Sequence, residues 1–214
     1  MKTKFFSIFS VLTLISFFGL SQIDVTPTVG YNFGAKVPIY GGEIKVKGNT
    51  TYGLNLDYNL DRDNAIQFMY STTISTVTIR DYYGPGAGAT EHFSDVLENY
   101  FLLGGVRYFS DGPIQPYGNF NLGMAYYKFT NINDYYAQIG QSDFTRFAIG
   151  FGLGAKVMFT EKIGLDLHIR ALAPIQWGGL GIGVGTGGAN AGVYAGSSFL
   201  SGDVGGGLII RLGE

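Results

Sequence analysis

The feature that most constrains this chain is a strict two-residue alternation of apolar and small or polar side chains over residues 147–171. The alternation is interrupted once, by a polar turn at residues 160–162. A period of two is the pattern of a β-strand with two unlike faces, and two such runs across a short turn predict an antiparallel hairpin. Each run exceeds the usual strand of about five or six residues and reaches the length that crosses a bilayer at a tilt.

The composition favours a β-rich chain over a soluble helical one. Charged residues make up 14% of the 214 residues, against about 25% in a typical soluble domain. Gly, Tyr and Phe are abundant, and there is no Cys, which excludes disulfides, thiolate metal sites and a cysteine nucleophile. The net charge of −2 gives no reason to expect a nucleic-acid partner.

The N-terminus has the form of a secretory signal peptide. Lys2 and Lys4 precede an apolar run over residues 5–20, and Ser21 offers a small residue before the expected cleavage. The run is short for a membrane-spanning helix and lacks a basic flank after it. We therefore predict a signal peptide over residues 1–21 and one mature domain over residues 22–214. A secreted chain with no further apolar helix can still span a membrane as a barrel.

The alternation recurs along the mature chain and predicts eight strands. They cover about residues 25–33, 51–60, 65–79, 96–109, 115–129, 147–159, 163–171 and 198–212. The connections are alternately long and short, and the long ones cover about residues 35–49, 80–95, 130–142 and 173–197. Short turns therefore gather at one end and long loops at the other, as in outer-membrane barrels. The predicted fold class is all-β, an eight-stranded antiparallel up-and-down transmembrane β-barrel.

Alternation alone does not decide whether the apolar face contacts a protein core or lipid. A soluble lipocalin-like binding barrel would place leucine and valine inside and charged residues outside. Here the second face consists of Gly, Ser, Thr and Asn with few charges, unlike the Lys- and Glu-rich surface of a soluble sheet. Small residues also suit the narrow interior of an eight-stranded barrel. The pattern favours lipid outside, and the soluble barrel stays as an alternative.

The same phasing assigns aromatic and charged residues to places in the barrel. Aromatic residues near strand ends are expected to form interfacial girdles. These are Tyr31, Phe33, Tyr52, Tyr58, Tyr100, Tyr108, Tyr117, Tyr126, Phe147 and Phe159. In the fourth strand, both faces carry apolar residues. There we assign Tyr100, Leu102, Val106 and Tyr108 to the lipid face and Arg107 to the interior.

The interior is expected to hold a polar network. Its members are Asp57, Arg107, Arg146, Lys156, Asp166, His168, Arg170, Asp203 and Arg211. Charges in a space of low dielectric are costly unless they pair, so we expect ion pairs. An eight-stranded barrel is filled by its own side chains, which predicts a plugged interior. The alternative role for these charges is a proton or ion path.

The chain resembles the small eight-stranded outer-membrane barrels of the OmpA/OmpX-like, porin-family type, especially those of the Bacteroidetes. The resemblance is carried by the leader that ends before Gln22, by residues 116–123 and by residues 152–167. It implies a location in the cell outer membrane of a Gram-negative bacterium and a structural, surface-contact or assembly role. Family members commonly end in an aromatic residue, whereas this chain ends in Glu214.

The long connections are the expected places of contact with other envelope proteins or extracellular ligands, and outer-membrane lipid is the expected surrounding. Exposed aromatic residues favour interfaces. The candidate contact residues are Tyr82, Tyr83, Tyr135, Tyr136, Trp177 and Tyr194. The alternative is that these rings only lie at the lipid interface.

The sequence predicts no catalytic, cofactor-binding or metal-ligating residues. A glycine-rich match to a dinucleotide fingerprint at residues 183–188 is not followed by a helical pattern. A Ser–His–acid site that uses His92 and Ser94, or His168, would make the barrel a lipid-modifying enzyme or a protease. Nothing in the sequence brings such groups together, so the enzyme stays an alternative to a non-enzymatic barrel.

Overall fold

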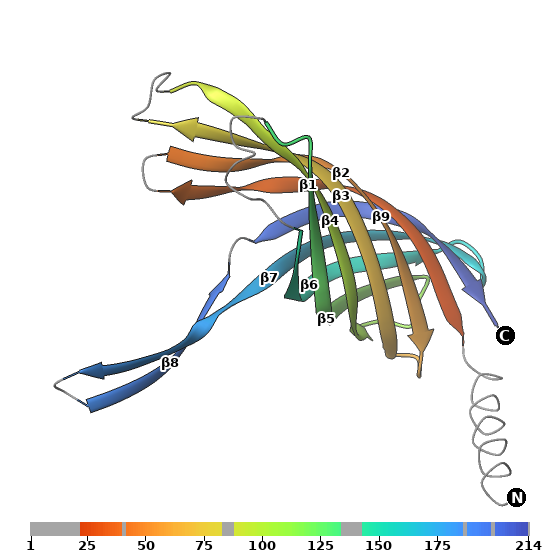
Figure 1. Cartoon of the computed structure of the whole chain (residues 1–214). Helices are drawn as coiled ribbons and strands as arrows, with labels where there is room; N and C mark the ends of the chain where they lie inside the picture. Colours follow the sequence, from red (N-terminus) through yellow and green to blue (C-terminus); the bar gives the residue numbers. More distant parts are fainter. Residues whose placement is uncertain are drawn as a thin grey trace, which may run out of the picture.

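Antiparallel strands that close into a barrel make up the described part of this chain (Figure 1). The computed structural model describes residues 22–39, 42–82, 88–133, 143–185, 188–197 and 200–213. The strands are β1 (Ile23–Ile39), β2 (Gly42–Asn59), β3 (Asn64–Asp81), β4 (Thr90–Tyr108), β5 (Ile114–Thr130), β6 (Phe144–Met158), β7 (Ile163–Gly185), β8 (Gly188–Ser197) and β9 (Ser201–Leu212). No helix within these residues is long and apolar enough to cross a membrane.

Eight of the strands form the closed ring, as the sequence predicted. Each strand from β1 to β7 pairs with the next, and β9 closes the ring between β7 and β1. Strand β8 was not expected. Among the described residues it pairs with the distal half of β7 alone, from Ile175 to Gly185, and the two form a hairpin that projects away from the ring (Figure 1).

The strands extend much further than the sequence indicated. Strands β1 and β2 stay paired as far as Ile39 and Gly42, where a loop was expected over residues 35–49. Residues 173–197, expected to be a loop, largely belong to β7 and β8. The prediction of long irregular loops is wrong at these places. In β2, an extra residue at a bulge breaks the two-residue period although pairing continues. In β7 and β8, the glycine-rich sequence shows no alternation of side chains, and the register shifts once between Gly178 and Gly181.

The faces of the barrel have the predicted orientation. Leu153 and Ile169 point outward and are 69% and 64% exposed, whereas Asp166 and Arg170 inside are 1% and 3% exposed. An apolar exterior over a polar interior is the arrangement of a transmembrane barrel and the reverse of a lipocalin-like one. The soluble alternative is therefore contradicted by the arrangement of side chains.

Strand β4 is the exception, because its phase is opposite to the one expected. The residues that point inward instead of outward are Tyr100, Leu102, Val106 and Tyr108. Phe101 and Leu103 lie outside, and the ring of Phe101 packs 5.0 Å from that of Tyr70 on the neighbouring strand. Both faces of β4 are apolar, so polarity could not decide its phase. The register with β3 and β5 decides it.

The inverted phase of β4 contributes Val96, Tyr100 and Leu102 to an apolar layer inside the barrel. Along the barrel axis, this layer lies between the polar network and the end that carries the long connections. Its buried members are Met69, Val77, Val96, Tyr100, Leu102, Ala125, Tyr127, Ala148 and Leu172. The interior is therefore not polar throughout, as the sequence had suggested. It consists of an ionic layer near the short turns and, beyond it, an apolar layer that also contains buried polar side chains, among them Glu98, Ser75 and Ser94.

The lipid-facing wall can be tested with two substitutions on one face of β7. Ile169 lies near mid-depth and Ile163 lies next to the short turn, and both are exposed. We expect Ile169→Arg to lower the free energy of unfolding in lipid by about 2–4 kcal/mol, and Ile163→Arg by about 0–1 kcal/mol, because the cost of a cation falls toward the interface. Urea unfolding in phospholipid vesicles measures both. Equal effects of the two changes would contradict a lipid-facing wall.

Candidate functional site

Lys156 is the centre of the ionic layer. Its Nζ atom donates hydrogen bonds to Oδ2 of Asp24 and Oδ2 of Asp57, both at 2.8 Å, and to the hydroxyl of Tyr108 at 2.7 Å. Lys156 comes from β6, and its partners come from β1, β2 and β4. One buried side chain therefore connects strands on opposite sides of the ring.

The carboxylates around Lys156 have further donors. The guanidinium of Arg211 donates from Nε and Nη2 to the two oxygens of Asp24, at 2.7 and 3.1 Å. Gln67 donates to the second oxygen of Asp57 at 2.7 Å and accepts a hydrogen bond from Asn119 at 2.8 Å. The two carboxylates are thus neutralised by two cations, and Asp57 is also held by the amide of Gln67, as buried charges require.

A second cluster lies beside the first. Tyr117 donates to Oδ1 of Asp166 at 2.7 Å, and Nδ1 of His168 lies 2.6 Å from Oδ2 of the same carboxylate. Arg170 donates from Nε to both oxygens of Asp203, at 2.9 and 3.2 Å. The other ring nitrogen of His168 is 3.7 Å from Asp203, so the imidazole stands between two carboxylates.

The structure places most of the predicted network inside the barrel. Buried members are Asp57, Lys156, Asp166, His168, Arg170 and Asp203, and Arg211 is partly buried at the mouth. Arg146 lies on the interior side near the outer end, with its guanidinium 5.0 Å from the ring centre of Phe144. The prediction for Arg107 is wrong. It lies on the outer surface, 3.3 Å from Asp63, because β4 has the opposite phase.

Sequence reasoning missed several members of this network. Asp24 was missed because the first strand was expected to begin only at about residue 25, although polar residues at every second position (Asp24, Thr26) continue the interior face. Tyr108 and Tyr117 were assigned to girdles, and both lie inside with rings 6.2 Å apart. Nothing in the alternation distinguishes a tyrosine that anchors at an interface from one that serves a buried carboxylate.

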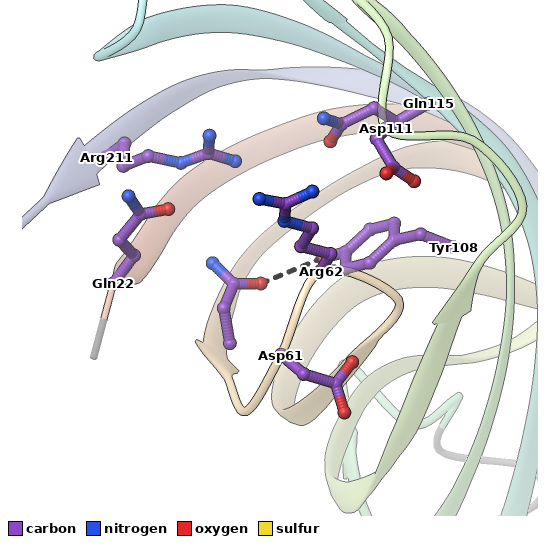
Figure 2. Close-up of a pocket in the computed structure, with 8 residues that line it drawn as sticks. Gln22, Asp61, Arg62, Tyr108, Asp111, Gln115 and Arg211 are labelled. Carbon is purple, nitrogen blue, oxygen red and sulfur yellow. Dashed lines mark hydrogen bonds between the residues drawn. The ribbon is translucent and has the colours of Figure 1, made fainter. Parts of the chain in front are cut away.

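A polar cavity of about 280 Å³ opens from the ionic layer at the short-turn end (Figure 2). It is lined by Gln22, Asn59, Asp61, Arg62, Tyr108, Asp111, Gln115 and Arg211. Asn64 donates its side-chain amide to both oxygens of Asp61, at 2.9 Å each, and this holds the pKa of Asp61 below its usual range. The hydroxyl of Tyr108 accepts from Lys156, so the inner wall of the cavity belongs to the ionic layer.

The residues of the alternative catalytic site are not assembled. Ser94 is fully buried and faces the interior, whereas His92 is exposed on the other face with its Nε2 3.4 Å from Asp95. His168 is deep in the interior network. Among the described side chains, no group of three or more His, Asp and Glu could hold a metal ion.

The candidate contact residues are only partly described. Tyr82 is 47% exposed, and the guanidinium of Arg80 lies 5.8 Å from its ring centre. Trp177 and Tyr194 belong to the β7–β8 hairpin. Tyr83, Tyr135 and Tyr136, like the expected signal peptide over residues 1–21, lie outside the described residues.

The ionic layer can be tested by removing its central cation. Lys156→Met leaves Asp24 and Asp57 buried without their shared cation, which we expect to lower the free energy of unfolding by about 3–5 kcal/mol. Adding Asp57→Asn to the same chain should recover part of this loss. Lys128→Met, at an exposed position of β5, should change it by no more than about 0.5 kcal/mol. Urea unfolding in lipid, followed by circular dichroism, gives all three values, and equal losses for Lys156 and Lys128 would refute the role of the network.

Comparisons with known proteins bear on the fold. No protein-family model and no curated protein matches the chain. The outer membrane protein OprG of Pseudomonas aeruginosa superposes over 92% of this chain and 98% of its own, with a TM-score of 0.61 and 12% identity. Neisserial surface protein A superposes over 90% and 97%, with a TM-score of 0.54 and 14% identity. The Bacteroidetes type stays a prediction. This chain has the closed eight-stranded antiparallel fold of the small outer-membrane barrels.

Proposed function

We propose that this chain is a non-enzymatic protein of the bacterial outer membrane that presents a raised β-structured surface outside the cell and does not conduct. Its partners would be outer-membrane lipid and molecules that meet the raised surface, whether other envelope proteins or extracellular ligands. Neisserial surface protein A, which shares the fold, is by name a surface protein, and this supports the proposed role.

The observation that carries the proposal is that the strands exceed the membrane on one side only. A strand crosses a bilayer in about 9–11 residues, whereas β1 to β4 contain 17, 18, 18 and 19 residues. Ile23 of β1 pairs with Leu212 of β9 at the end of the short turns, close to the apolar wall. The excess therefore extends from the other end, and the β7–β8 hairpin adds to it (Figure 1).

The filled interior argues against a pore. The ionic layer joins opposite walls of the barrel through Lys156. The apolar layer lies further along the barrel axis and crosses the same interior. A Cβ added to Gly150 would come within 2.9 Å of Leu102 and 3.2 Å of Leu172, so these two side chains occupy the space that the glycine leaves. Two successive filled layers are therefore expected to close the bore.

Conductance tests the closed interior. Purified protein in a planar lipid bilayer should give no unitary current steps. Replacing Met69, Leu102 and Leu172 with alanine should leave the bore closed by the ionic layer, and adding Lys156→Ala and Arg170→Ala should produce steps. Heat-modifiable migration in electrophoresis verifies that each variant is folded. Stable current steps from the unmodified protein would contradict the proposal.

Surface presentation can be tested with single cysteines, because the chain contains none. Tyr82→Cys lies on the outer extension and Lys162→Cys lies in the short turn between β6 and β7, and both native residues are exposed. A membrane-impermeant maleimide added to intact cells should label Tyr82→Cys at once. It should label Lys162→Cys only after the outer membrane is permeabilised. Labelling in the opposite order, or of both in intact cells, would refute the orientation.

A further inference from the structure

A cationic groove of about 270 Å³ lies on the outer extension of β1, β2 and β3. Its described lining residues are Lys36, Glu43, Lys45, Lys47, Thr78, Arg80 and Thr90. Four of these carry a positive charge, and Glu43 is the one carboxylate among them. This groove therefore has a formal charge of +3 in a chain whose net charge is −2.

Strand register brings these cations together. Lys36 is directly opposite Lys45, Lys47 is opposite Gly34, and Glu43 is opposite Arg80. Like charges that face each other across a strand pair are destabilising. Among the side chains that the structure describes, none forms an ion pair with Lys36, Lys45 or Lys47. Their concentration here is not explained by the fold, and it is suited to an anionic ligand.

A bulge in β2 points the lysines away from the barrel interior. Val46 and Thr51 are five residues apart, but their partners on β3, Val77 and Thr73, are four residues apart, so β2 contains one extra residue. Val46 beyond the bulge packs against the apolar layer of the interior. Because successive side chains alternate, Lys45 lies on the outward face.

The groove lies just beyond the aromatic residues that mark the outer edge of the apolar wall. Phe33 and Tyr52 are each 60% exposed on the outward face. Lys36 follows Phe33 by three residues, or roughly 10 Å along an extended and tilted strand. In a barrel that spans the outer membrane, an outward-facing groove at this level would lie at the depth of the headgroups of the outer leaflet.

We propose that this groove binds the phosphorylated glucosamine headgroup of lipid A in the surrounding lipopolysaccharide. Lysines act as point charges that suit phosphate, and contacts between ammonium and phosphate are strong because both groups are charged. A lipid of the outer leaflet can contact the outward face of the barrel directly. A soluble polyanion would have easier access to the distal ends of the strands than to this groove. The proposal rests on the proposed outer-membrane location.

The test measures binding of purified lipid A to the full chain in neutral detergent micelles by native mass spectrometry. The variant combines Lys45→Gln with Lys47→Gln. Its affinity for phosphorylated lipid A should fall on the order of thirtyfold, since two basic residues near an anionic surface each contribute roughly a factor of five. Lipid A from which phosphatase has removed the phosphates should bind the unmodified chain with a similar loss.

The matched control combines Lys128→Gln with Lys162→Gln, which removes the same charge from two exposed positions outside the groove. It should bind lipid A like the unmodified chain. Equal affinity of the two double variants, or undiminished binding of dephosphorylated lipid A, overturns the proposal. Binding of inositol hexakisphosphate without binding of lipid A would assign the groove to a soluble polyanion instead. Cell fractionation reports the membrane location separately, so the two conclusions can fail independently.

Discussion

The hydrogen bonds of the Lys156 ammonium group hold together the end of the barrel that carries the short turns. Lys156 is 2% exposed and reaches three strands, and its two carboxylate partners come from the first two strands of the chain. Buried charges that lose their partner cost several kcal/mol, so the pairing constrains the ring more strongly than a surface ion pair would. Arg211 on the last strand binds Asp24 on the first, which places a charge-assisted contact across the seam where the ring closes.

Lipid outside and ions inside also explain the glycines of β9. A Cβ at Gly205 would lie 3.0 Å from Nε2 of His168 and 2.7 Å from the carbonyl oxygen of Val29, so a larger residue would collide with the network and with the neighbouring strand. The interior of an eight-stranded barrel has room for its own side chains and little more. Long polar side chains on some strands therefore leave room only for glycine at the facing positions of others.

The fold was largely predictable from alternation, and the site only in part. Eight ring strands, their antiparallel order and the orientation of β6 and β7 follow from the two-residue period, because one face of these strands is small or polar. Strand β4 has two apolar faces, so its register is decided by its neighbours, and Arg107 moved outside with it. The pairing partners of Lys156 come from strands far apart in the chain, and no local pattern specifies them. The first long connection was misjudged because a bulge in β2 changes the parity of the pattern, and the last because its glycine-rich sequence has no side-chain alternation.

The extra residue of β2 has a consequence for how the whole molecule sits in its membrane. From the bulge toward the short turn, the outward side chains of β2 are apolar. From the bulge toward the outer end, the outward positions carry lysine, and Val46 points inward. The two parts of the same strand thus prefer different solvents, hydrocarbon for one and a hydrated, anionic layer for the other. Vertical displacement in either direction would bring charge into hydrocarbon or phenylalanine into water. A single inserted backbone unit therefore contributes to the immersion depth of the protein, because it marks where the outward face of β2 changes from apolar to cationic.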